Sequence, residues 1–236
     1  MYKAIRGKQK AKIKIVGEAN AILLVGYIVI SDTHFLFDRD IRNYEASYHI
    51  LSSIKKLKRY GKKLIIAGDF KDPIFTVNEK EKQLLREFIE DLLTVFSDIQ
   101  IIKGNHDGKL EKIIGSDFVV RGRSLRIKDV VIAHGHAWPN LLDDRTKFVI
   151  LGHSHPVFEF EEYPNNPKVP VFVKYSIKDE FKERIGGKPE IIVLPAFNEY
   201  LGGHDVREML LDVFYLYGYA DKESIKVYTR NGIQLI

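Results

Sequence analysis

The sequence predicts a layered α/β fold in which a second sheet packs on the first. Three observations support this prediction. Strand-like and helix-like segments alternate over residues 12–107, short strand-like runs dominate from Asp117 onward, and five apolar runs each end in a polar cluster. Because the 236 residues are 45% hydrophobic, the chain can bury a sizeable core, and we expect a single domain over residues 1–236.

The first half of the chain alternates strands and helices. Residues 12–16 and 21–30 are predicted strands, and a helix over residues 43–60 should begin at an asparagine cap. Asn78, with Glu81 three positions later, is typical of the start of a second helix. Seven apolar positions of that helix should be buried against the sheet, namely Leu84, Phe88, Leu92 and Phe96 with Leu85, Ile89 and Leu93 beside them.

The second half of the chain should be rich in short strands. The clearest lie at residues 118–120, 125–127, 130–133 and 148–151. Residues 163–170 contain three prolines and two asparagines and are predicted to form a surface loop. The charged segment 178–190 leaves three interpretations open, which are a lid, an excursion at a sheet edge and an oligomer contact.

The composition excludes several classes of site. The chain has no cysteine, so disulfides, zinc–thiolate sites and thiol catalysis are excluded. Its formal net charge of +5 permits an anionic substrate such as nucleic acid without requiring one. A basic run over residues 55–63 should lie at a helix end that faces away from the polar clusters. No stretch approaches the roughly 20 apolar residues of a membrane span, so we expect a cytoplasmic protein without a membrane partner.

The polar clusters at the strand ends predict one metal site. They are Asp32-Thr33-His34, Gly68-Asp69, Gly104-Asn105-His106-Asp107, His134-Gly135-His136 and Gly152-His153-Ser154-His155. Side chains that follow buried strands meet at the carboxyl edge of a sheet. Six of the eight histidines belong to these clusters, whereas His49 fits a structural position on the first helix. Carboxylate, amide and imidazole ligands suit Mn²⁺, Fe²⁺ or Zn²⁺.

The order of these five clusters resembles the calcineurin-like metallophosphoesterases, whose motifs are D-x-H, GD, GNHD, H and GHxH. The resemblance implies a four-layer α-β-β-α sandwich of two mixed sheets flanked by helices. It also implies a centre of two divalent ions, with Mn²⁺ expected and Fe²⁺, Zn²⁺ and Ni²⁺ as alternatives. The implied activity is hydrolysis of phosphodiester bonds, in nucleotides or nucleic acid, or of phosphomonoesters by a metal-activated hydroxide.

The same resemblance assigns roles to individual residues. One metal would be held by Asp32, His34 and His155, the other by Asn105, His134 and His153, and Asp69 would bridge the two. His106 would stabilise the transition state and protonate the leaving oxygen, oriented by Asp107. We prefer His134 to His136 as the ligand because it follows the strand directly, which leaves His136 to contact the substrate or support the ligands.

Two further stretches qualify the resemblance. Phe35-Leu36-Phe37 stands where the family usually has a small residue, which predicts a more apolar pocket wall. Residues 194–203, LPAFNEYLGG, resemble a subgroup of archaeal phosphoesterases related to the SbcD-type repair nuclease and of bacterial DNA-ligase-associated phosphoesterases. This stretch could face the substrate or form only a strand and a tight turn. A non-catalytic scaffold, or a DNA-repair-associated binding protein, is the alternative function, and a homodimer is an open alternative.

Overall fold

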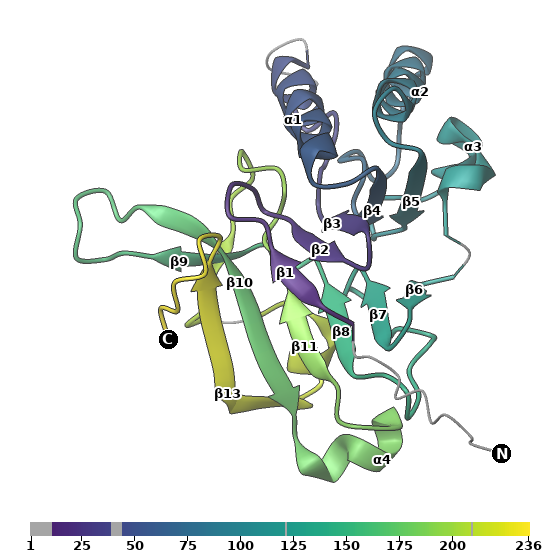
Figure 1. Ribbon diagram of the computed structural model, residues 1–236. Coiled ribbons are helices and arrows are strands. Elements are labelled where there is room, and N and C mark those ends of the chain that lie inside the picture. Colours follow the sequence, from purple (N-terminus) through teal and green to yellow (C-terminus); the bar gives the residue numbers. More distant parts are fainter. Residues whose placement is uncertain (1–10, 39–43, 121, 209) are drawn as a thin grey trace, which may run out of the picture.

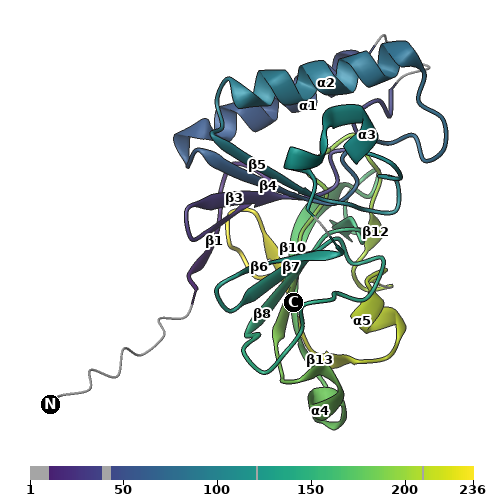
Figure 2. The same cartoon turned by 90° about the vertical axis from the view of Figure 1, so that its right-hand side faces the viewer.

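The computed structural model describes residues 11–38, 44–120, 122–208 and 210–236. Its fold is the predicted one, with two mixed sheets packed face to face and helices on their outer faces (Figures 1 and 2). Figure 2 shows the layers edge on, with α1 (Glu45–Lys56) and α2 (Glu79–Leu93) above the first sheet. Beside the second sheet lies α5 (Val213–Leu216), and α4 (Lys182–Ile185) lies at its lower end.

The first sheet has the strand order β1-β2-β3-β4-β5. Its strands are β1 (Ile13–Ile15), β2 (Ile22–Leu24), β3 (Tyr27–Ile30), β4 (Lys63–Ala67) and β5 (Asp98–Ile102). β1 to β3 are antiparallel neighbours, whereas β3, β4 and β5 are parallel. The three parallel strands therefore place their carboxyl ends at one edge.

The second sheet has the order β12-β9-β10-β11-β8-β7-β6, and β13 also pairs with β10. Its strands are β6 (Ser124–Ile127), β7 (Val130–Ala133), β8 (Phe148–Leu151), β9 (Pro156–Glu159), β10 (Lys168–Ile177), β11 (Glu190–Val193), β12 (His204–Asp205) and β13 (Ala220–Thr229). The central strands β7, β8 and β11 are parallel, and their carboxyl ends also share one edge.

Both helices predicted from the sequence form with their amphipathic pattern, and three short helices were not predicted. They are α1 (Glu45–Lys56), α2 (Glu79–Leu93), α3 (Glu111–Ile114), α4 (Lys182–Ile185) and α5 (Val213–Leu216). The capping box of Asn78 and Glu81 is confirmed at the start of α2, and its apolar stripe is buried except for Leu93. The helix predicted from residue 43 begins at Glu45, while Asn43 lies outside the described residues.

Alternating side chains fill three apolar layers. Val29 of β3 lies in the core between the sheets, and its neighbour Ile28 lies in the core beneath α1 and α2. In the second sheet, Ile150 of β8 joins the central core and Val149 joins the core near α5. Because side chains of a strand alternate between faces, both sheets need apolar residues at consecutive positions.

Three sequence predictions about elements are wrong. Residues 21–30 form a hairpin rather than one strand, because Val25 and Gly26 adopt positive φ values of 48° and 84°. Residues 118–120 form no strand, since a short 3-10 helix covers Ser116–Phe118 and Val119 makes only an isolated bridge. The loop predicted at 163–170 ends earlier, because β10 begins at Lys168.

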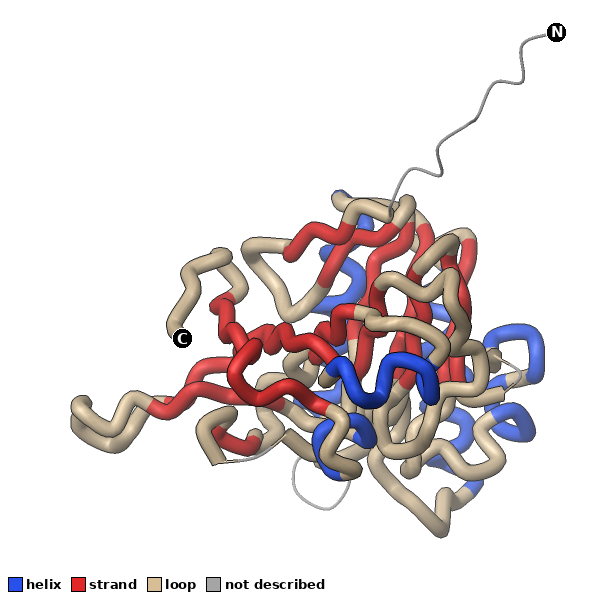
Figure 3. The backbone as a smooth tube through the Cα atoms, turned by 90° about the horizontal axis from the view of Figure 1, so that it is seen from below, coloured by secondary structure: helices blue, strands red, loops and turns tan. Residues whose placement is uncertain are grey.

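Two long connections lie away from the edge where the polar clusters meet. The segment 178–190 lies at the amino end of β8, since Glu190 pairs with Phe148, so it does not cover the carboxyl edge as a lid would. The hairpin of β9 and β10 projects from the body (Figures 1 and 3). In the described part of the chain, no helix has the length and apolar content needed to cross a membrane.

Candidate metal centre

The structure brings the five polar clusters together where the carboxyl ends of the two sheets meet. In the first sheet, Ile30 pairs with Ile66 and Ala67 pairs with Ile102, so the loops that follow β3, β4 and β5 are neighbours. The loop after β8 reaches the first sheet, because the backbone N–H of His153 donates a hydrogen bond to Asp32 Oδ2 at 3.0 Å.

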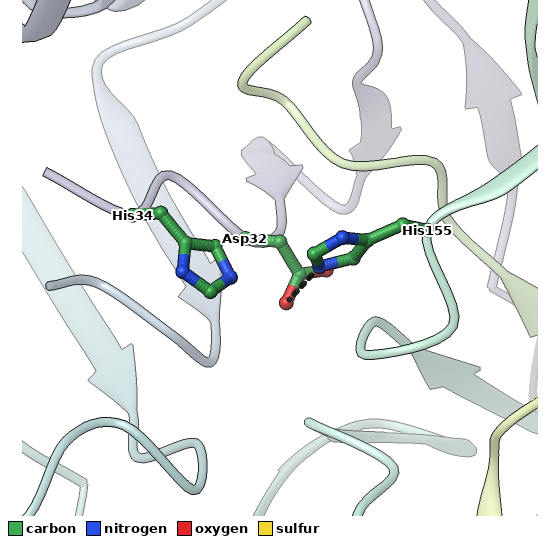
Figure 4. A group of neighbouring side chains, drawn as sticks. All are labelled: Asp32, His34 and His155. Atoms are coloured by element: carbon green, nitrogen blue, oxygen red, sulfur yellow. Dashed lines mark ion pairs between the residues drawn. The ribbon is translucent and has the colours of Figure 1, made fainter. Parts of the chain in front are cut away.

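Three overlapping groups of side chains could hold metal ions. Within each group the candidate ligand atoms lie within 4.8 Å of one another, and the groups are Asp32, His34 and His155; His34, Asp69 and His106; and Asp69, His134 and His153. Figure 4 shows the first group, with the rings of His34 and His155 on either side of the Asp32 carboxylate. Asn105 belongs here too, since its Oδ1 lies 3.0 Å from His134 Nε2.

Two buried atoms of the first group have no hydrogen-bond partner. Asp32 Oδ1 and His34 Nε2 are both enclosed and make no hydrogen bond, which is costly for polar atoms, although oppositely charged groups lie 3.4 to 3.6 Å away. The other ring nitrogen of His34, Nδ1, lies 3.0 Å from Asp72 Oδ1, so this carboxylate orients the ring. A histidine held by a carboxylate at one nitrogen and free at the other is the usual arrangement of a metal ligand. The residues therefore fit a divalent cation.

Asp69 and His134 lie at the centre of the site. Asp69 Oδ2 is 3.3 Å from His134 Nε2 and 3.6 Å from His34 Nε2. Burial alone would lower the pKa of His134, but the carboxylates of Asp69 and Asp32 raise it to about 9. Burial would likewise raise the pKa of Asp69, but hydrogen bonding and charge from His134 hold it below its ordinary value. Without metal, the buried negative charge is thus partly balanced by a proton on His134.

The glycines of the motifs leave room for these side chains. Gly68, Gly104 and Gly152 each face a proposed ligand so closely that no Cβ would fit. The nearest atoms that an added Cβ would meet are, in turn, His134 Nδ1 at 2.0 Å, Asp69 Oδ1 at 2.0 Å and Asp32 Oδ2 at 2.6 Å. The motif glycines are therefore required by close packing within the site.

Five of the expected ligands have a strained backbone. Their φ angles are positive, at 54° for Asp32, 44° for His34, 39° for Asp69, 69° for His153 and 42° for His155. Such conformations cost about 1–3 kcal/mol each for residues other than glycine and persist where the surroundings impose them. The sharp turns aim successive side chains at one point from loops that follow different strands.

The expected contact between Asp107 and the ring of His106 is absent from the described residues, which corrects the predicted role of Asp107. The buried carboxylate of Asp107 accepts hydrogen bonds from the backbone N–H groups of Gly104, Phe70 and Lys71 instead. It is a loop-forming residue, because it binds three backbone donors on two motif loops.

The ring of His106 is positioned by the loop after β4. Its Nδ1 contacts the backbone carbonyl of Asp72, and its Nε2 lies 3.9 Å from Asp69 Oδ2. Lys71 is buried, and its ammonium group donates to the backbone carbonyls of Pro73 and His106. Lys71 and Asp72 were not predicted as site residues; their only signal in the sequence is a charged pair one residue after the Gly-Asp motif.

The remaining predicted positions differ in exposure. His136 is exposed, and its ring centroid lies 5.1 Å from that of His134 and 6.0 Å from that of His153. It is therefore at the rim, where a substrate contact remains open to it. Phe35 and Leu36 are fully buried in the core beneath the helices, so they do not form the expected apolar pocket wall.

Comparison with known proteins identifies the family. Residues 26–169 match the calcineurin-like phosphoesterase superfamily domain, which is more than half of the 236 residues. The chain belongs to this superfamily. No curated protein matches it. The nuclease MPE of Pseudomonas putida shares the fold at 16% identity and a TM-score of 0.58, covering 94% of this chain and 98% of that one. Yfce, a phosphoesterase from E. coli, matches at 14% identity and a TM-score of 0.34, over 56% and 71%.

Outside the matched region, residues 194–203 pack against the metal-motif loops of this superfamily member. The backbone N–H groups of Phe197 and Asn198 donate to the carbonyls of Ser31 and Asp32. At the other end of the segment, a Cβ on Gly203 would meet the backbone oxygen of His155 at 2.3 Å. The segment therefore supports the site from behind, a role that the sequence did not suggest.

Proposed function

We propose that the chain is a phosphoesterase that uses two divalent metal ions. Asp32, His34 and His155 would hold one ion, Asn105, His134 and His153 would hold the other, and Asp69 would contact both. The observation that carries this proposal is the position of Asp69, which belongs to two of the three groups of candidate ligands. A single carboxylate shared between two ligand groups is what a bridged pair of ions requires.

The protein residues would divide the remaining tasks. When bound, the ions would polarise the phosphoryl oxygens and supply the nucleophile at neutral pH. Asp32 and Asp69 contribute two negative charges against four positive ones, so the loaded site would attract a phosphate group. His106, held at Nδ1 by the carbonyl of Asp72, keeps Nε2 on the side of Asp69 and would protonate the leaving oxygen from there.

The ligand types restrict which ions the site would bind, and the likeness to a nuclease restricts the class of substrate. Four imidazoles, two carboxylates and one amide oxygen suit Mn²⁺, with Fe²⁺, Zn²⁺ and Ni²⁺ as alternatives. The substrate would be a phosphodiester or a phosphomonoester, and the likeness to a protein described as a nuclease supports a nucleic acid. Residues 194–203 support membership of the subgroup related to the SbcD-type and DNA-ligase-associated phosphoesterases.

Metal content and hydrolysis test the proposal together. After dialysis against Mn²⁺, the wild-type protein should hold two ions per chain by mass spectrometry and hydrolyse bis(p-nitrophenyl) phosphate or p-nitrophenyl phosphate. Asp69→Asn should lose both ions and activity, because a neutral amide cannot offset two divalent charges. Asp179→Asn, which changes an exposed carboxylate paired with Lys188, is the matched control and should behave as wild type. Full occupancy and activity in Asp69→Asn would refute the proposal.

A further inference from the structure

A turn at the rim of the site carries an arginine that the proposed chemistry does not use. In the antiparallel pair of β6 and β7, Ser124 is paired with Ala133. Arg123 precedes Ser124 and therefore lies beside His134, at the carboxyl end of β7. The start of β6 is thus placed at the edge of the sheet where the candidate ligands meet, beside β7 in Figure 1.

The backbone of this turn is fixed while the side chain is free. Asn140 Oδ1 accepts hydrogen bonds from the Arg123 N–H at 3.3 Å and from Ser124 Oγ at 2.6 Å. Gly122 lies against the same side chain, since its Cβ would meet Asn140 Nδ2 at 3.0 Å. The guanidinium of Arg123 is exposed and forms no ion pair with any carboxylate in the described part of the chain.

A guanidinium that is exposed and has no carboxylate partner is available to bind an anion at this position. A guanidinium matches a phosphate geometrically, because it donates two parallel hydrogen bonds.

We infer that Arg123 binds a second phosphate of the substrate, next to the one that is cleaved. The substrate class is then an oligonucleotide rather than a small ester with a single phosphate. This inference rests on the proposed function. The scissile group would lie over Asp69, enclosed by buried ligands such as His134, whereas Arg123 stands outside them in solvent. The Arg123 side chain is therefore placed to bind the phosphate next to the scissile one in an oligonucleotide.

Comparing two substrates distinguishes contact with the scissile phosphate from contact with the neighbouring phosphate. With a short single-stranded oligonucleotide, Arg123→Gln should raise KM about ten- to a hundredfold, the usual loss for a charge-assisted hydrogen bond. With bis(p-nitrophenyl) phosphate, which has one phosphate, kcat and KM should not change. The salt dependence of log KM for the oligonucleotide should become shallower by about 0.7, as expected for one lost contact to a single strand. Arg123→Lys should restore part of the loss.

The matched control is Lys128→Gln. Lys128 is exposed in the turn at the other end of the same hairpin, about 17 Å away along β6, and its loss removes the same charge. It should leave both substrates unaffected. An equal effect of the two variants, or no effect of Arg123→Gln on the oligonucleotide, would overturn the inference. A raised KM for bis(p-nitrophenyl) phosphate would overturn it too, since Arg123 would then contact the scissile group.

Binding decides the inference even if the proposed function fails. If wild type hydrolyses neither substrate, the phosphoesterase proposal is wrong. Fluorescence anisotropy with a hydrolysis-resistant phosphorothioate oligonucleotide still compares the variants. Weaker binding by Arg123→Gln, with Lys128→Gln unchanged, supports the phosphate contact, and equal binding by all three proteins overturns it.

Discussion

Replacing Gly104 by alanine should damage the metal centre without touching a ligand. A Cβ at this position would lie 2.0 Å from Asp69 Oδ1 and 2.5 Å from the backbone nitrogen of Asp69. Because ordinary contact begins at 3.4 Å, the oxygen would have to move by about 1.4 Å, the difference between 3.4 and 2.0. The second contact is with backbone, so rotation of the Asp69 side chain cannot relieve it.

The cost of Gly104→Ala combines strain with a lost hydrogen bond. Overpacking costs about 1–3 kcal/mol. The hydrogen bond from the His106 N–H to Asp69 Oδ1, now 2.9 Å, would also be disturbed, and bonds to charged groups contribute about 1.5–3 kcal/mol. We expect the free energy of unfolding to fall by about 2.5–6 kcal/mol. Ligand positions in metal sites tolerate only about 0.2 Å, so binding of both ions that Asp69 would contact should also be lost.

Gly108→Ala is the control for this prediction. Gly108 is in the same loop, and no atom lies within 4 Å of its added Cβ. Urea unfolding in the presence of a chelator measures the free energy of unfolding of the metal-free protein. Mass spectrometry after dialysis against Mn²⁺ measures how many ions each variant retains. If Gly104→Ala matches Gly108→Ala in both measurements, the prediction that a Cβ at position 104 displaces Asp69 is wrong.

The other predictions concern acid catalysis, proton release and core stability. His106→Ala should keep both ions and lose about 10²–10⁴-fold in kcat, with a smaller loss for a nitrophenolate leaving group; an equal loss for good and poor leaving groups would exclude proton donation. Because the pKa of His134 is raised to about 9, its proton must leave before a metal binds. Metal affinity measured by titration should therefore rise up to tenfold per unit between pH 7 and 9, and a flat profile would contradict this. Tyr175→Phe should lower the free energy of unfolding by about 1–3 kcal/mol in urea, since its hydroxyl donates to buried Asp212 at 2.6 Å; unchanged stability would show that water replaces the hydroxyl.

The predictable part of the site consists of residues that directly follow buried strands. Asp32, Asp69 and His134 each come within two residues of a fully apolar run, so the sheet itself determines where they lie. Strand periodicity also predicted the layers, because consecutive apolar residues imply that both faces are covered. The chain-order pattern of motifs then identified the family without any structural information.

The unpredicted part depends on the paths of loops. The apolar run over residues 21–30 gave no turn signal beyond one glycine, so the Val25-Gly26 hairpin was missed. Asp107 was expected beside the ring of His106 because the two are adjacent in sequence, yet its carboxylate satisfies backbone donors on another loop. The contact of Asp72 with two histidines likewise depends on how the loop after β4 folds back. Periodicity carries no information about such backbone hydrogen bonds.

The support of the site by residues 194–203 has a consequence for synthesis of the chain. Ser31 Oγ donates to the carbonyl of Pro195, and Asn198 Nδ2 donates to that of Thr33, contacts that span 164 and 165 positions. A ribosome therefore completes the first sheet and its helices long before these loops receive their supports. Contacts this distant form late, because closing a long loop costs entropy first. A nascent chain that stops after His155 would carry every proposed ligand but lack the segment that holds Asp32 in place, so metal loading should follow completion of the chain.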